Sequence, residues 1–411
     1  MNKETTMKIV TTRPGLAFLA LALAALALAA VYEGPRTFKA SEVLKPSEVE
    51  GPHYKVAPAV PTEAYFYIFS VTTDYGALEA EGKSMLLVRL DEVRALAELD
   101  DVSKSEVFLA SAGTSVLNVG KGAVAAVKDP GATAKGIGGG LKRFGTNLGR
   151  TAKQATSTGK SEGEKTVDAG GVANSVLGIN AAARKWAQKV GVDPYTTNQI
   201  LKKALSDLGQ IDAAGSIAAK VVVPIPMVVS ATATVGNLVW AKDPQALLKE
   251  NEQQLRALGV SDDVIKKLYL SKGFTLTLHT RLVVALSAVK AKGSADYVAT
   301  AAEADTEREA LFFAESAEML TRFHQKTPIL ELLSDSRALV GKTRDGRAAA
   351  LLPIDWVSWT EAYEKALREA GERARKELGA AKLEMKLTGR MSETAKKETA
   401  TLGWAVAENV S

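Results

Sequence analysis

A glycine-rich, basic stretch at residues 118–175 limits what this chain can fold into more than any other feature. Each glycine weakens a helix by about 1 kcal/mol relative to alanine, and Pro130 interrupts the stretch as well. The end of the stretch, TSTGKSEGEKTVDAGG, has the composition of a flexible linker. These residues oppose a stable helix in water, so we expect the chain to form separate parts on either side of them.

The same stretch has a strong positive charge with a regular spacing. Residues 121–160 carry a net charge of +7, and lysine recurs at every seventh position from Lys121 to Lys142. Because seven residues turn an α-helix through about 700°, roughly 20° short of two turns, these lysines would share one helix face. Apolar residues at i, i+4, i+7 and i+11 would form a narrow stripe. The surface-binding residues that this pattern predicts are Lys121, Lys128, Lys135, Lys142, Arg143, Arg150, Ile137, Leu141, Phe144 and Leu148.

Residues 119–153, which we call the basic segment, allow three interpretations on sequence grounds. The segment is a flexible connector, a helix that forms on an anionic surface or a partner, or part of an ordinary core.

The sequence does not support a nucleotide-binding site in this segment. Residues 120–125 match G-x-G-x-x-A, but residues 131–161 include no acidic side chain that could bind a ribose.

The first 29 residues have the pattern of a secretory signal peptide. Basic residues precede an unbroken apolar run, GLAFLALALAALALAA, and Ala27 and Ala29 fit the small-x-small rule for cleavage. Sixteen apolar residues are fewer than the about 20 that a membrane-spanning helix needs. The chain also has no cysteine, which is ordinary for an exported bacterial protein. We expect export to the periplasm or the extracellular space, with a mature chain that begins near Ala30.

Periodicity divides the mature chain further. Five prolines make residues 30–63 a candidate Pro-rich tether. A β-branched and aromatic run followed by helical spacing predicts a small N-terminal α+β unit at 64–117. Residues 176–335 predict a helical domain. Within it, residues 221–241 are the most apolar stretch, which is either buried core or a membrane insertion.

Residues 336–411 predict a small C-terminal α+β module. An Asp-Gly turn at 345–346 between two strand-like runs predicts a hairpin. KLEMKL alternates strictly, which predicts a strand with Leu383, Met385 and Leu387 buried and the charged residues between them facing outward. Helices between the strands predict parallel pairing. The fold class that follows is α+β and predominantly helical, with small α+β parts at both ends and a helical middle domain.

No catalytic group of residues is visible in the sequence. Residues 159–163 match G-x-S-x-G, but their flanks, TST and EKT, lack the strand and helix that a nucleophile elbow needs. His53, His279 and His324 do not have metal-binding spacing. Of the formal charge of +5, the signal peptide carries +2, which leaves too little to imply nucleic acid. We expect no metal, cofactor or small-molecule ligand from these patterns.

Two stretches resemble an uncharacterised family of exported bacterial proteins. They are KWAQKVGVDPYTTNQIL at 185–201 and LVWAKDPQALLKENEQQLRALGV at 238–260. The resemblance implies export and brings no known activity.

The function that the sequence favours is that of an exported, non-catalytic envelope protein. It would bind an anionic membrane surface or an envelope partner through the basic segment, and so would be membrane-associated. The alternative is an exported hydrolase whose site is assembled from residues dispersed in the sequence, because such a site leaves no local motif. A pocket in which Asp, Glu or His side chains converge would favour the hydrolase.

Overall fold

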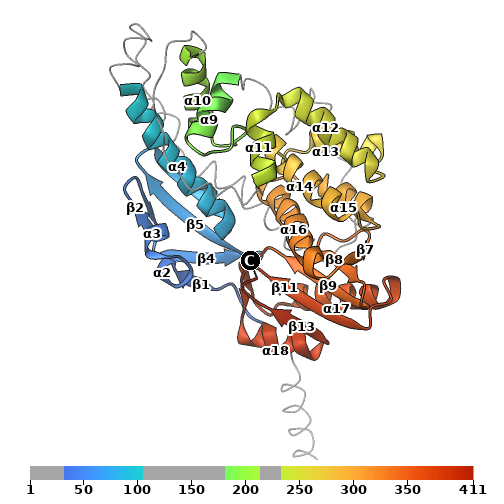
Figure 1. Cartoon of the computed structure of the whole chain (residues 1–411). Coiled ribbons are helices and arrows are strands. Elements are labelled where there is room, and N and C mark those ends of the chain that lie inside the picture. Colours follow the sequence, from blue (N-terminus) through green and yellow to red (C-terminus); the bar gives the residue numbers. More distant parts are fainter. Residues whose placement is uncertain (1–31, 105–180, 213–232, 411) are drawn as a thin grey trace, which may run out of the picture. The chain divides into compact units, whose positions relative to one another are not determined.

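The computed structural model describes residues 32–104, 181–212 and 233–410. The described residues of Pro35–Ser411 belong to one compact unit. They form a mixed α/β fold with thirteen helices, thirteen strands in three sheets and no closed barrel (Figure 1). No helix in these ranges is long and apolar enough to cross a membrane.

The predicted α+β, predominantly helical fold class is therefore wrong. In the part of the chain that the structure describes, 53% of residues are helical and 21% lie in strands, which is a mixed α/β composition. The two larger sheets have six and five strands. Many of their strands have only two to six residues, and such short strands carry little periodicity from which a sequence could reveal them.

The N-terminal sheet has the strand order β1-β4-β5-β3-β2, and β6 pairs with β5. Its strands are β1 (Thr37–Lys39), β2 (Glu50–Gly51), β3 (Tyr54–Val56), β4 (Ala59–Glu63), β5 (Phe66–Thr73) and β6 (Gly76–Glu81). Short helices α2 (Ala40–Val43) and α3 (Pro46–Val49) lie between the first two strands. The long helix α4 (Lys83–Lys104) packs on β5 and β6 (Figure 1).

The tether expected at residues 30–63 is instead largely part of this sheet. Phe38, Tyr54 and Val60 are buried in the core, so the segment contributes apolar side chains to it. Its prolines occupy positions that ordered structure allows; Pro46, for example, is in the first turn of α3, where the missing N–H costs nothing. Proline content therefore indicated a tether where the chain forms short strands.

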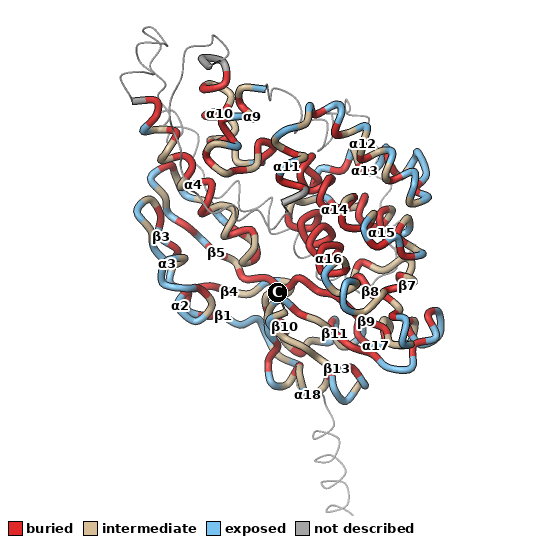
Figure 2. The backbone as a smooth tube through the Cα atoms, viewed as in Figure 1, coloured by how far each residue is buried: buried red, intermediate tan, exposed pale blue. Residues whose placement is uncertain are grey.

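The described residues 181–212 and 233–326 contain helices and no strand, while the predicted bounds of the helical domain, 176–335, also take in strand β7 (Ile329–Leu332). The helices are α9 (Ala181–Lys189), α10 (Gln199–Asp212), α11 (Ala233–Ala241), α12 (Pro244–Ala257), α13 (Asp262–Leu270), α14 (Leu276–Val289), α15 (Ser294–Ala301) and α16 (Glu307–Lys326). Helices α14 and α16 pack against each other, and Figure 2 shows both buried along most of their length. Of the apolar stretch 221–241, only α11 lies within the described residues, and its Val235 and Val239 are buried.

The C-terminal sheet has the order β13-β11-β9-β8-β7. Its strands are β7 (Ile329–Leu332), β8 (Leu339–Thr343), β9 (Arg347–Leu352), β11 (Lys382–Leu387) and β13 (Trp404–Ala407). The predicted hairpin is confirmed, because β8 and β9 pair antiparallel around Gly346, whose φ is 84°. The predicted parallel pairing is also confirmed: β9, β11 and β13 run parallel and are connected through α17 (Glu361–Glu377) and α18 (Glu393–Thr401). A separate parallel pair joins β10 (Trp356–Val357) and β12 (Arg390–Met391).

Strand β11 confirms one half of its predicted pattern and corrects the other. Leu383, Met385 and Leu387 are buried, as the alternation predicts. Glu384 was expected to face outward, but it is only 7% exposed. The reason is that α16 packs on β8 and β9, so the polar face of the sheet is also covered near this residue.

Candidate functional site

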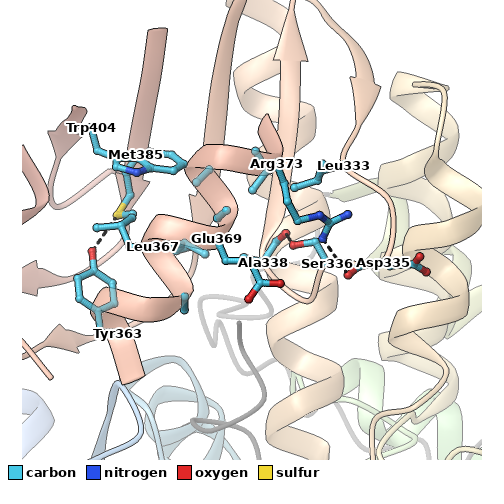
Figure 3. A pocket seen from close by; sticks show the side chains of 15 residues that line it. Leu333, Asp335, Ser336, Ala338, Tyr363, Leu367, Glu369, Arg373, Met385 and Trp404 are labelled. Carbon is cyan, nitrogen blue, oxygen red and sulfur yellow. Dashed lines mark hydrogen bonds between the residues drawn. The ribbon is translucent and has the colours of Figure 1, made fainter. Parts of the chain in front are cut away.

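An apolar slot lies between α17 and the C-terminal sheet (Figure 3). Its wall includes Tyr363, Leu367, Met385 and Trp404, and Figure 3 shows Arg373 at its polar end. The volume of about 50 Å³ would hold only a few water molecules. Alanines at several lining positions leave this gap, so we interpret the slot as imperfect packing and not as a ligand site.

A second hollow, also of about 50 Å³, borders a group of charged side chains and hydroxyls that we call the polar junction. Its members come from α4, the loop before α10, α14 and α16. They are Arg89, Glu92, Asp193, Thr196, Thr277 and Glu307.

Every carboxylate of the polar junction is held by hydrogen-bond donors. Arg89 donates to Glu92 at 2.9 Å and to Glu307 at 2.6 Å, and Thr196 also donates to Glu92. Thr277 donates to Asp193 at 2.6 Å. The junction therefore fastens the loop that follows α9 to three helices.

The surroundings of Asp193 shift its pKa. Burial raises the pKa of Asp193 to about 6, although hydrogen bonds from Thr277 and from the backbone of Tyr195 act against the rise. A raised carboxyl pKa beside a hollow is one sign of an active site. Here the carboxylates are engaged and the hollow is small, so the geometry favours a structural role.

A larger cavity, of about 330 Å³, lies between the last turns of α16 and the C-terminal sheet. This volume is within the range of pockets that bind small molecules. Four cationic side chains and one carboxylate line it, so we call it the basic cavity. The charged residues are Arg322 and Lys326 from α16, Arg347 from β9, and Glu384 and Lys386 from β11.

The register of the C-terminal sheet brings together the three charged residues that it contributes to the cavity, Arg347, Glu384 and Lys386. Strand β11 pairs with β9 in parallel, so alternate residues of both strands point to the face that α16 covers. Arg347 contacts Glu384 at 2.8 Å, and Lys386 contacts the other oxygen of Glu384 at 3.3 Å. Asp345 also pairs with Arg347 at 2.9 Å, and hydrogen bonds from Arg347 and Thr343 lower the pKa of Asp345 to about 2.

The two cations from α16 are placed differently. Arg322 and Lys326 are exposed, and neither makes an ion pair or a side-chain hydrogen bond with another residue of the described ranges. They lie one turn apart, so both can reach the same group. Their position near the helix C-terminus also suits the helix dipole, but that effect does not require a cavity beside them.

The sequence did not predict the basic cavity, and the residues it did predict cannot be compared with it. Lys121, Lys128, Lys135, Lys142, Arg143, Arg150, Ile137, Leu141, Phe144 and Leu148 all lie outside the described residues. Two local signals pointed toward the cavity: the alternation that places Glu384 and Lys386 on one strand face, and the i,i+4 spacing of Arg322 and Lys326. Neither signal shows that the two elements meet.

A metal centre has no support in the described ranges, since no group of three or more histidine or carboxylate side chains there is placed to hold an ion. Comparison of the chain with models of protein families, with curated proteins and with solved structures finds no match.

Proposed function

We propose that this protein is an exported, non-catalytic binding protein whose basic cavity takes up small anionic molecules. The observation that carries the proposal is the charge of the cavity: four cationic side chains face a volume of about 330 Å³ that contains a single carboxylate. Unpaired cations on the wall of a cavity attract anions and bind them more strongly than an open surface does. No residue of the cavity is required to act as a nucleophile or a base.

The proposal keeps the sequence-based expectation of an exported envelope protein. The apolar run before Ala30 supports export, and the net charge of the basic segment supports binding to an anionic membrane leaflet or an acidic partner. Under the same proposal the chain is periplasmic or extracellular, in line with its resemblance to exported bacterial proteins. The cavity and the basic segment would then be two sites for anions, one for small molecules and one for a surface.

Within the described ranges, the polar junction is the site that best fits the hydrolase alternative. Carboxylates do converge there from α4, α16 and the loop before α10. Each one is engaged by an arginine or a hydroxyl, and the hollow beside them is too small for more than a few waters. We therefore favour binding over hydrolysis.

Isothermal titration with benzenesulfonate tests the cavity, with neutral benzyl alcohol as the matched probe. We expect benzenesulfonate to bind and benzyl alcohol not to bind. Replacing both free cations, Arg322→Gln with Lys326→Gln, should remove the binding, because these exposed residues contribute charge and little to the fold. The control Lys249→Gln with Lys266→Gln removes two exposed lysines elsewhere and should bind normally. Equal heats from wild type and the cavity variant would contradict the proposal.

The export and surface parts of the proposal need separate tests. N-terminal sequencing of the secreted protein should find a start near Ala30, and a start at Met1 would contradict export.

Sedimentation with anionic and neutral vesicles tests the basic segment. Binding should prefer anionic vesicles, weaken with salt and fall when Lys128, Lys135 and Lys142 are changed to glutamine. Equal sedimentation with both vesicle types would show that the segment is a connector.

A further inference from the structure

The charges of the basic cavity are not equally available to a ligand. Glu384 engages Arg347 and Lys386, and Asp345 engages Arg347 a second time. These two cations are therefore largely neutralised by carboxylates of the chain itself. Arg322 and Lys326 have no such partner in the described part of the chain. The available positive charge is thus two, and both charges lie on the same face of α16.

The spacing of these two residues suits one compact group with two negative charges. Side chains at i and i+4 of a helix are about 6 Å apart at their Cβ atoms, and both are long enough to converge on a single ligand group. Arginine binds phosphate oxygens through two parallel N–H donors, and lysine adds a point charge. A monoanion would leave one of the two cations without a partner.

Apart from Thr327, the rest of the wall is apolar. Met319 and Phe323 of α16, Leu351 of β9 and Val410 near the C-terminus line the same cavity. The ammonium group of Lys386 lies 6.0 Å from the centre of the Phe323 ring. A ligand that fills this space needs an apolar body next to its charged group.

We propose that the basic cavity binds a phosphate monoester with an apolar ester group, and that Arg322 and Lys326 hold the dianionic phosphate. This inference rests on the proposed anion-binding function and adds the class of ligand. Glu384 is a positioning residue in this site. It holds Arg347 and Lys386 in place, and its own charge disfavours a second anionic group on the ligand near the sheet.

Phenyl phosphate and benzenesulfonate test the inference, because they share an aromatic ring and differ in charge. At pH 8 phenyl phosphate is a dianion, and we expect it to bind about tenfold more tightly than benzenesulfonate. At pH 5 phenyl phosphate is a monoanion, since the second pKa of a phosphate ester is about 6, and the preference should disappear. Benzenesulfonate, measured at both pH values, corrects for titration of the cavity itself, whose charged groups are Arg322, Lys326, Arg347, Glu384 and Lys386.

Single variants assign the preference to residues. Lys326→Gln should bring phenyl phosphate close to benzenesulfonate in affinity, while Lys249→Gln should leave the tenfold difference in place. Equal affinity of the wild type for the two probes at pH 8 would overturn the inference and leave the proposed anion-binding function intact. Binding of neither probe would overturn both.

A phosphate monoester with an apolar body is either a free small molecule or the headgroup of a lipid. Sedimentation with phosphatidylcholine vesicles, with and without phosphatidic acid, distinguishes the two sources when every protein carries Lys128→Gln, Lys135→Gln and Lys142→Gln, so that the basic segment does not contribute. If the Arg322→Gln, Lys326→Gln variant loses binding to phosphatidic acid vesicles, the ligand is a lipid headgroup. If vesicle binding is unchanged and only binding of phenyl phosphate is lost, the ligand is a free ester. If the variant loses neither, the inference is wrong.

Discussion

The carboxylate of Asp355 accepts the backbone N–H of Lys83 at 3.1 Å, so a residue of the loop between β9 and β10 caps the first turn of α4. The same oxygen accepts the backbone N–H of Tyr67, on β5, at 3.0 Å. Asp355 is half-buried, and the loss of water around its carboxyl raises its pKa to about 6. One side chain therefore joins the N-terminal sheet and its helix to the C-terminal part of the chain.

Replacing Asp355 should lower the free energy of unfolding, unless the new side chain still accepts hydrogen bonds from Lys83 and Tyr67. We expect Asp355→Ala to lower the free energy of unfolding by about 3 kcal/mol, because two shielded N–H groups lose their acceptor. Asp355→Asn keeps one oxygen and should cost about 1 kcal/mol. Urea unfolding measures both, with Glu372→Ala as an exposed control. Equal losses from the alanine and asparagine variants would show that the hydrogen bonds are not the cause.

A buried ion pair between α14 and α16 gives a second test. Arg281 contacts Glu318 through two hydrogen bonds of 2.7 and 2.9 Å, and both side chains are buried. Glu318→Leu should cost about 4 kcal/mol, because it removes the carboxylate that makes two hydrogen bonds with the buried guanidinium. The double variant Arg281→Met, Glu318→Leu should recover most of that loss. If the double variant lost as much free energy of unfolding as the two single variants together, the losses would not come from the interaction between Arg281 and Glu318.

The buried histidine on α14 should make stability depend on pH. His279 is fully buried against Asn251, and burial lowers its pKa to about 3. In the unfolded chain the pKa is near 6.5, so the unfolded state binds a proton first as pH falls. Protonation of His279 in the unfolded chain therefore lowers the free energy of unfolding by about 2 kcal/mol between pH 7.5 and pH 5. The stability is present above pH 6.5 and is lost progressively down to about pH 3.

His279→Phe isolates this effect from the rest of the chain. Phenylalanine keeps an aromatic ring against Tyr269, which packs edge-on to His279 at 5.0 Å, and cannot titrate. The carboxyls of Asp193 and Asp355 act in the opposite direction, because a raised folded pKa adds stability as pH falls through about 6. Wild type and His279→Phe both retain these carboxyls. The difference in their free energies of unfolding should therefore grow in favour of His279→Phe as the pH falls. A difference independent of pH would contradict the assignment.

The sequence predicted those parts of the fold that are determined by residues close together in the chain. The Asp-Gly turn and the alternation of β11 are of this kind, and both elements are confirmed. Strands β5 and β6 of the N-terminal sheet lie within the predicted α+β unit, but β1 to β4 were missed, because β1 pairs with β4 across 20 to 24 residues and each of these four strands is too short to show a period. The contact between Asp355 and Tyr67 spans 288 positions, which no local pattern can indicate.

The basic cavity was missed for the same reason. Lys386 and Glu384 read as the solvent face of a strand, and Arg322 with Lys326 reads as the basic end of a helix. Each reading is reasonable alone. The packing of α16 on β8 and β9 turns these charges into the wall of a cavity, and no local pattern in the sequence shows that these elements meet.

The apolar slot predicts opposite effects for neighbouring alanines of β9. Ala350 lines the slot beneath α17, whereas Ala349 pairs with Glu384 on the opposite face, toward α16, and is fully buried. Both are strand positions, so valine changes strand propensity equally at each. Ala350→Val should raise the free energy of unfolding by about 1 kcal/mol, because it fills a gap of about 50 Å³. Ala349→Val should lower it by about 2 kcal/mol, because it adds volume to a filled core. Urea unfolding of both variants decides the matter, and a loss of stability from Ala350→Val would show that the slot has no room for a side chain.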